Sequence, residues 1–436
     1  MRMTTVVLGA LLLELAGSLA AQTPPDTIPT VIRAGRLFDS EAGVFVGPRE
    51  LLIRNGGIVA VAEKVERPAG ARVIDLSNRT VLPGLIDAHT HLLYLEGVTG
   101  GLTMEGVKAL VNEGLPLRAL HGAARARTFL AAGITTVRDL GNSGLFGDVA
   151  LRVAIEDGSV DGPRMWVSGP GLSPVGGQFP GLKPGYESLA ADEYRIVRNP
   201  AEAADAVREN VTMGANVIKI FSNNTPNAGY LTVEEMTAIV AAARLHGVRV
   251  AAHATSDAAV YRAALAGVNS IEHAYQVADS TLALMARNGV TMVPTDIDSV
   301  SIVHYLTLAN PGQPAPPPEQ VSRYLAAGRD RLRRAVKAGV TITAGSDNYL
   351  DLKWAQGTAA RRVLFAYHQA GLTPVQVLQA ATINDARLLG MEHRLGVLKA
   401  GARADVIAVE GDLERDFSAL ERVRFVMKAG TVYIGR

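Results

Sequence analysis

The sequence predicts an α/β fold, a (β/α)8 TIM barrel joined to a small β-sandwich domain that is formed from both chain ends. Three observations predict it. Between Pro83 and Leu389, short apolar runs alternate with long alanine-rich stretches of helical period. Several of these stretches end in glycine just before the next apolar run, and glycine is a common helix stop. The two flanking regions consist of short β-branched runs separated by glycine.

The composition is that of a large, neutral globular protein. The chain has 436 residues, 48% of them hydrophobic, and its 43 basic and 42 acidic side chains give a net charge of +1. A disordered chain would contain fewer apolar residues. A nucleic-acid-binding protein usually carries a basic excess, so we expect no nucleic-acid partner. The chain has no cysteine, which excludes a thiol nucleophile, disulfides and a cysteine-ligated zinc site.

Residues 1–21 are predicted to be a secretory signal peptide. A short basic start is followed by an apolar run over residues 6–16 and by small residues at 18–20. The run contains Glu14 and is too short to span a bilayer. We therefore expect an exported protein, periplasmic or secreted, with no membrane span. The alternative is a cytoplasmic protein with an apolar N-terminus.

Residues 29–82 and 391–436 are predicted to form one small β domain. The first segment contains apolar runs at 31–33, 50–53 and 57–61, and Asn55-Gly56 between the last two is a strong hairpin signal. The second segment returns to short β runs at 404–410, 423–428 and 431–434. Two unrelated appendages are the alternative to a shared domain.

Residues 83–390 have the length and the alternating pattern of a TIM barrel. Helical stretches lie between the apolar runs, among them residues 234–246, 256–266, 280–288 and 330–338. The eight candidate strands are residues 85–91, 134–139, 164–168, 216–221, 248–253, 270–273, 291–295 and 341–347.

Four of the nine histidines end predicted strands, and in a β/α barrel the carboxyl ends of the strands face the active site. His89 and His91 stand two residues apart, so both side chains can share one face of the strand and bind one metal ion. His253 and His273 end two later strands. The alternatives are polar strand ends that contact water and histidines that pack in the core.

Lys219 and Asp347 complete this set of candidates. Lys219 lies within an otherwise apolar strand, where an unpaired ammonium would be costly. A neutral lysine can react with carbon dioxide to give a carbamate that bridges two metals; the alternative is a lysine whose ammonium extends to the strand end. Asp347 follows Gly345-Ser346 and could bind a metal and take a proton from bound water, or could form an Asx turn.

The sequence here resembles the amidohydrolase superfamily over nearly its whole length. The resemblance rests on residues 81–92 (VLPGLIDAHTHL), 135–139 (TTVRD) and 345–347 (GSD), on the strand of Lys219, and on residues 381–390 and 395–405 near the end. Within that superfamily the chain is most similar to the imidazolonepropionase-like and Xaa-Pro dipeptidase-like subgroup.

The resemblance implies a binuclear metal centre, usually of zinc. It assigns the first ion to His89, His91 and Asp347, and the second ion to His253 and His273. Lys219, carbamylated by carbon dioxide, would bridge the two ions. A metal-bridging hydroxide would attack an amide carbonyl, and Asp347 would pass the proton to the leaving nitrogen.

Two further residues are candidates for contact with the substrate. Tyr230 matches a tyrosine that helps to bind the substrate carboxylate in dipeptidase-like members, although a packing role is equally consistent with the sequence. Gln178 stands where related chains usually have the histidine of a Gly-Gly-His loop. Because glutamine carries no charge, this difference predicts a changed substrate contact.

We therefore expect a metal-dependent amidohydrolase that cleaves a C–N bond in a small carboxylate-bearing substrate. Dipeptides of the Xaa-Pro type and N-acyl amino acids, including ochratoxin-like amides, fit this class. One alternative is a mononuclear deaminase or a cyclic amide or amidine hydrolase on the same fold. A remote alternative is a non-enzymatic periplasmic binding protein. The resemblance leaves homo-oligomerisation open.

Overall fold

The computed structural model describes residues 28–435 except 100–106, 109, 180–182 and 225–227. The predicted signal peptide, residues 1–21, lies outside the described residues. Within the described ranges, no helix is both long enough and apolar enough to cross a membrane.

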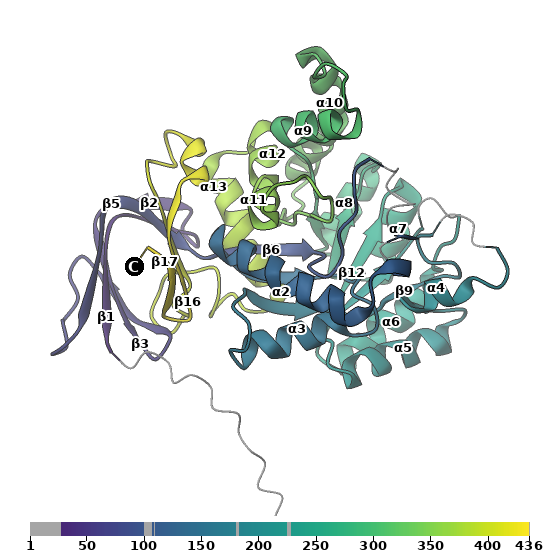
Figure 1. Cartoon of the computed structure of the whole chain (residues 1–436), viewed down its shortest axis with the longest axis horizontal. Coiled ribbons are helices and arrows are strands. Elements are labelled where there is room, and N and C mark those ends of the chain that lie inside the picture. Colours follow the sequence, from purple (N-terminus) through teal and green to yellow (C-terminus); the bar gives the residue numbers. More distant parts are fainter. Residues whose placement is uncertain (1–27, 100–106, 109, 180–182, 225–227, 436) are drawn as a thin grey trace, which may run out of the picture.

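Parallel strands form the centre of the larger part of the molecule (Figure 1). One sheet has the order β6-β7-β8 and the other has the order β10-β9-β11-β12-β13-β14. The amide of Asn216 donates to the carbonyl of Val167 at 3.0 Å and joins the two sheets between β8 and β11. The strands are β6 (Leu85–Thr90), β7 (Ile134–Asp139), β8 (Arg164–Val167), β9 (Gly171–Ser173), β10 (Tyr194–Ile196), β11 (Val217–Phe221), β12 (Arg249–Ala254), β13 (Ser270–His273) and β14 (Thr291–Val293).

The predicted eighth strand, residues 341–347, is not a regular strand. It is reduced to an isolated parallel bridge between Ile342 and Met292. The amide of Ala88 then donates to the carbonyl of Ala344 at 2.8 Å, which links this segment to β6. The chain passes so close to β6 at Gly345 that an added Cβ would lie 2.7 Å from the Cβ of His89. The amide of Asp347 donates to the carbonyl of His89 at 2.8 Å, so the segment lies between β14 and β6 and hydrogen-bonds to both.

Helices alternate with the strands and cover them, as the sequence pattern predicts (Figure 1). The five predicted glycine stops, at 133, 247, 267, 289 and 339, all have φ between 66° and 88°, a left-handed conformation that favours glycine. The helices are α2 (Leu115–Ala131), α3 (Gly147–Glu156), α4 (Glu187–Ala191), α5 (Pro200–Thr212), α6 (Val233–Leu245), α7 (Asp257–Ala266), α8 (Asp279–Arg287), α9 (Ser299–Ala309), α10 (Pro318–Lys337), α11 (Gln356–Arg361), α12 (Val363–Gln369), α13 (Pro374–Gln379), the π-helical segment Ala380–Asn384, and α14 (Asp385–Leu389).

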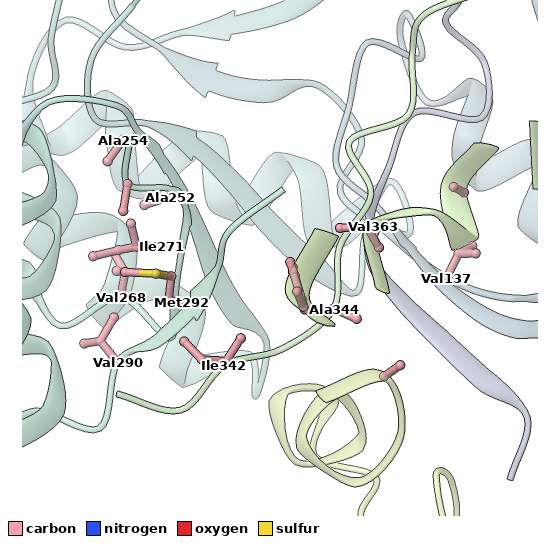
Figure 2. Packing of buried hydrophobic residues seen from close by; sticks show 14 of the residues in the cluster. Val137, Ala252, Ala254, Val268, Ile271, Val290, Met292, Ile342, Ala344 and Val363 are labelled. Atoms are coloured by element: carbon pink, nitrogen blue, oxygen red, sulfur yellow. The ribbon is translucent and has the colours of Figure 1, made fainter. Parts of the chain in front are cut away.

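Apolar side chains fill the space around the barrel strands. Figure 2 shows Ile271, Met292 and Ile342 of three successive segments near one another, and all three are buried. Parallel strands covered on both faces carry continuous apolar runs of this kind. The polar residues described below are exceptions to this pattern, and they gather at the carboxyl ends of the strands.

Strands from both ends of the described chain lie in one sheet of eight strands (Figure 1). The order is β17-β16-β15-β5-β1-β3-β4, with β2 paired to β1. Asn55 and Gly56 have φ of 49° and 72° in the turn between β3 and β4, which confirms the predicted hairpin. The strands are β1 (Thr30–Asp39), β2 (Val44–Val46), β3 (Arg49–Arg54), β4 (Gly57–Ala62), β5 (Arg72–Pro83), β15 (Val406–Val409), β16 (Val423–Lys428) and β17 (Thr431–Ile434).

Candidate metal centre

The six predicted metal ligands all line one cavity of about 420 Å³ at the carboxyl ends of the barrel strands. They come from five separate segments of the chain, which meet because the carboxyl ends of barrel strands lie on one face. The six residues are His89 at the end of β6, His91 just after it, Lys219 in β11, His253 in β12, His273 at the end of β13, and Asp347 in the irregular eighth segment.

The Asp347 carboxylate lies among the histidines. Its Oδ1 is 3.0 Å from Nε2 of His91 and 3.5 Å from Nε2 of His89, and its Oδ2 is 3.7 Å from Nδ1 of His273. His89, His273 and Asp347 each offer one ligand atom, and these atoms lie within 4.8 Å of one another. That spacing is compatible with simultaneous binding to one metal ion.

Left-handed backbone turns bring two of these ligands to the cavity. His273 has φ of 74° and Asp347 has φ of 49°. Alternation along β13 would point His273 away from the face that Glu272 occupies, and the left-handed turn brings it back. Backbone conformations of this kind carry a cost that functional sites commonly retain.

Lys219 is 1% exposed, and its Nζ lies 3.3 Å from Nε2 of His89. It makes no ion pair with a carboxylate in the part of the chain that the structure describes. Burial lowers the pKa of Lys219 to about 8. Near neutral pH the fraction of free amine is then roughly 300 times that of an ordinary lysine. A free amine is the form that reacts with carbon dioxide.

Hydrogen bonds fix the rings of two histidines. Nδ1 of His89 lies 2.8 Å from Oε2 of Glu272, and Nδ1 of His91 lies 2.9 Å from the carbonyl of Gly141. Both oxygens are acceptors, so Nδ1 of each ring carries the hydrogen and Nε2 faces the cavity, where Nε2 of His91 lies within hydrogen-bond distance of Asp347. Metal-binding histidines are commonly held in this way.

Glu272 belongs to a buried network that connects three strands. Its Oε1 accepts from Nη2 of Arg138 at 2.9 Å and from Oγ of Ser270 at 2.5 Å. Arg138 also donates to the carbonyl of Ala88, at 2.6 Å. The sequence reasoning did not identify Glu272 as a functional residue. A signal was available, because a glutamate within a buried strand is costly unless it is paired.

The charge states of the side chains suit a divalent cation. Burial lowers the pKa of His253 to about 3, with Lys219 adding to the effect, and burial also lowers the pKa of His89 and His273. His91 differs, because Asp347 raises its pKa against the effect of burial. Burial opposes ionisation of Asp347, but His89, His91 and Lys219 hold its pKa below the usual value. Neutral imidazoles and an ionised carboxylate are the ligands that zinc and similar ions take.

The two predicted substrate contacts lie in different surroundings. Gln178 lines the cavity, and its Nε2 is 3.3 Å from Nε2 of His253. Tyr230 is 55% exposed, does not belong to the cavity lining, and has the guanidinium of Arg262 over its ring at 4.8 Å. Thr232 caps α6 two residues later. A role for either residue in substrate binding stays a prediction.

Comparisons with known proteins agree on one family. A model of the amidohydrolase family matches residues 80–433. The ochratoxinase of Aspergillus niger is 29% identical over 443 residues, which cover 93% of this chain and 87% of that protein. An imidazolonepropionase of Symbiobacterium thermophilum is 28% identical over 417 residues, which cover 86% of this chain and 89% of that protein.

Solved structures give the same result. The crystal structure of a Xaa-Pro dipeptidase with bound methionine in the active site superposes with a TM-score of 0.79 at 30% identity, covering 93% of this chain and all of the other. The A. niger ochratoxinase structure has a TM-score of 0.77 at 26% identity, covering 94% and 96% of the two chains. A TIM barrel is typical of the family, which agrees with the predicted fold class.

Proposed function

This chain belongs to the amidohydrolase family, and on that premise we propose that it cleaves an amide bond in a small carboxylate-bearing substrate with two bound divalent metal ions. The relatives indicate a hydrolase that acts on carbon–nitrogen bonds. The observation that carries the proposal is the convergence of four histidines, one aspartate and one lysine on a single cavity.

The donor set suggests how two ions would be shared. His89, His91 and Asp347 would hold one ion, His253 and His273 would hold the other, and a carbamate on Lys219 would contact both. When bound, ions of this kind lower the pKa of a bound water and polarise the carbonyl that it attacks. Zinc is our first choice, because histidine and carboxylate ligands suit it.

The protein's own groups supply the proton transfer. Asp347 is ionised, since its pKa is held below the usual value by His89, His91 and Lys219 against the effect of burial. It can therefore take the proton of the attacking water and hand it to the leaving nitrogen. Glu272 and the carbonyl of Gly141 keep two imidazoles aimed at the cavity throughout.

The proposed substrates are dipeptides and N-acyl amino acids. The comparisons include an ochratoxinase and a Xaa-Pro dipeptidase, and both names point to small amides. Gln178 at the cavity wall offers a neutral hydrogen-bonding amide, which suits a carbonyl or carboxylate oxygen. We also propose export of the protein, and N-terminal sequencing of the mature chain would test this.

One observation favours a second candidate, a mononuclear hydrolase or deaminase. His89, His273 and Asp347 alone bring three ligand atoms within 4.8 Å of one another, which suffices for a single ion. Under this alternative, Lys219 would not be carbamylated. The number of metal ions per chain separates the two candidates.

Metal removal tests the proposal directly. Hydrolysis of a panel of dipeptides and N-acetyl amino acids would be measured before chelation, after chelation, and after addition of Zn²⁺ with bicarbonate. We expect activity on at least one amide, a loss of more than about 100-fold after chelation, and recovery with metal. Full activity in a sample that contains no divalent metal would overturn the proposal.

A further inference from the structure

A second cavity of about 450 Å³ lies directly against the metal cavity. The two cavities share three wall residues, Tyr275, Asp347 and Tyr349. Tyr275 is 48% exposed although it comes just after the buried end of β13. This exposure is consistent with a side chain that lines a cavity. A molecule bound beside Asp347 can therefore extend into either cavity.

The walls of the second cavity are mainly apolar and aromatic. Ile302 and Tyr305 come from α9, and Tyr324 and Leu325 come from α10. Tyr324 is 60% exposed, whereas Ile302 and Leu325 belong to a packed cluster behind it. Cavities of several hundred Å³ with such walls bind drug-sized apolar groups.

Two lining carboxylates of the second cavity are paired with lining arginines, and the guanidinium of Arg329 donates to Oε1 of Gln369. Asp296 binds the guanidinium of Arg331, and Asp298 accepts from Nε of Arg362 at 2.9 Å. A cationic group would therefore find no unpaired carboxylate among the lining residues except Asp347. An uncharged apolar group would disturb neither of the two ion pairs on entering.

We infer that the second cavity holds the amine-side group of the substrate and selects a large apolar or aromatic one. This inference rests on the proposed function, in which Asp347 gives its proton to the leaving nitrogen. That nitrogen must lie beside Asp347, at the junction of the two cavities. Its substituent then points into the second cavity, while the acyl group stays with Gln178 and His253. The substrate class becomes amides of amino acids with bulky apolar side chains.

Two isomeric substrates test the assigned side. N-acetyl-L-phenylalanine carries its phenyl group on the amine side, and N-phenylacetyl-L-alanine carries it on the acyl side. Ala327 of α10 is exposed and lines the second cavity, whereas its exposed neighbour Ala326 does not. The variant Ala327→Trp should fill the cavity, and Ala326→Trp is the matched control on the same helix.

We expect Ala327→Trp to lower kcat/KM for N-acetyl-L-phenylalanine about 10- to 100-fold, the effect of losing a buried phenyl group. The value for N-phenylacetyl-L-alanine should change less than about threefold, and Ala326→Trp should leave both within about threefold. Equal losses for the two isomers, or a loss confined to the acyl-side isomer, would overturn the inference.

Binding of the free amine product separates this inference from the proposed function. L-Phenylalanine should bind the wild-type protein at least about tenfold more tightly than L-alanine by calorimetry, and Ala327→Trp should remove that preference. Equal binding of the two amino acids would overturn the inference even if the enzyme hydrolyses amides. A retained preference in a protein that hydrolyses no amide would overturn the proposed function alone.

Discussion

The metal cavity and the second cavity meet at Asp347, yet they are built in different ways. Strand ends supply the metal cavity, and buried hydrogen bonds from Glu272 and Gly141 fix its histidines. Helices α9 and α10 supply much of the second cavity, where the wall includes the half-exposed ring of Tyr324. The metal cavity is a polar site held by hydrogen bonds. The second cavity is mainly apolar, and its carboxylates Asp296 and Asp298 are paired with arginines.

This difference assigns catalysis to the metal cavity and the choice of substrate to the second cavity. A group that binds metal or moves a proton must keep its position to a fraction of an ångström, which strands and buried hydrogen bonds allow. A cavity that accepts an apolar group needs only shape and a dry wall, since the hydrophobic effect is non-directional. Substitutions of the metal-binding residues should therefore change the rate with every substrate, whereas substitutions in the second cavity should change the ranking of substrates.

The largest effect is expected for Asp347→Asn. The amide has the same shape but cannot accept a proton, so kcat should fall about 1,000-fold or more with every amide substrate. Steady-state kinetics would measure this, with circular dichroism to check the fold. Asp351→Asn, four residues along the same segment, is the control and should keep near wild-type kcat. A kcat for Asp347→Asn within tenfold of wild type would exclude Asp347 as the proton carrier.

Reactivation by carbon dioxide should follow the ionisation of Lys219. Its pKa is lowered to about 8 by burial, so the reactive amine increases about tenfold per pH unit below pH 8 and levels off above it. Metal-free protein stripped of carbon dioxide would be given Zn²⁺ and a fixed concentration of dissolved carbon dioxide. The initial rate of recovery should rise about 50-fold between pH 6 and pH 8, where half of the amine is free. Recovery that does not depend on carbon dioxide would argue against a carbamate.

A smaller effect is expected for Glu272→Gln. The amide cannot accept hydrogen bonds from both His89 and Arg138 as the carboxylate does, so the imidazole loses its fixed orientation. Metal affinity measured by competition with a chelator should fall about 10- to 100-fold. Glu235→Gln replaces a buried glutamate in the helix cap of α6 and should leave metal affinity unchanged. Equal metal affinities in the two variants would show that Glu272 does not support metal binding through His89.

The smallest effects are expected at the two predicted substrate contacts. Gln178→Ala removes one hydrogen-bonding group from the cavity wall and should raise KM about three- to tenfold with little change in kcat. Tyr230→Phe should change KM less than about twofold, because the hydroxyl does not line the cavity. A larger effect for Tyr230→Phe than for Gln178→Ala would show that the loop after β11 moves onto the substrate.

Much of the fold and most of the metal cavity could be predicted because both follow local rules. The glycine stops depend on left-handed φ values, and His89 and His91 share a face because side chains alternate along a strand. The eighth segment was wrongly predicted as a regular strand, because its apolar residues do not reveal that Gly345 lies against His89 and that the segment bonds to β14 and β6 without a regular ladder.

Other features depend on contacts between distant segments, which no single stretch of sequence displays. Glu272 contacts His89 across 183 positions of chain. The second cavity forms where α9, α10, α11 and α12 come together beside Tyr275. The metal-binding residues at strand ends can therefore be predicted from sequence, whereas the shape of the cavity between helices cannot.

Metal content is the most direct test of a binuclear centre bridged by Lys219. It would be measured by mass spectrometry for the wild-type protein and for Lys219→Ala, both purified without chelator. Lys428→Ala is the control, since burial lowers the pKa of that lysine to about 8 as well, far from the metal cavity. We predict two divalent ions per chain in the wild type and the control, and one or none in Lys219→Ala. One ion per chain in all three proteins would contradict the binuclear centre and favour the mononuclear alternative.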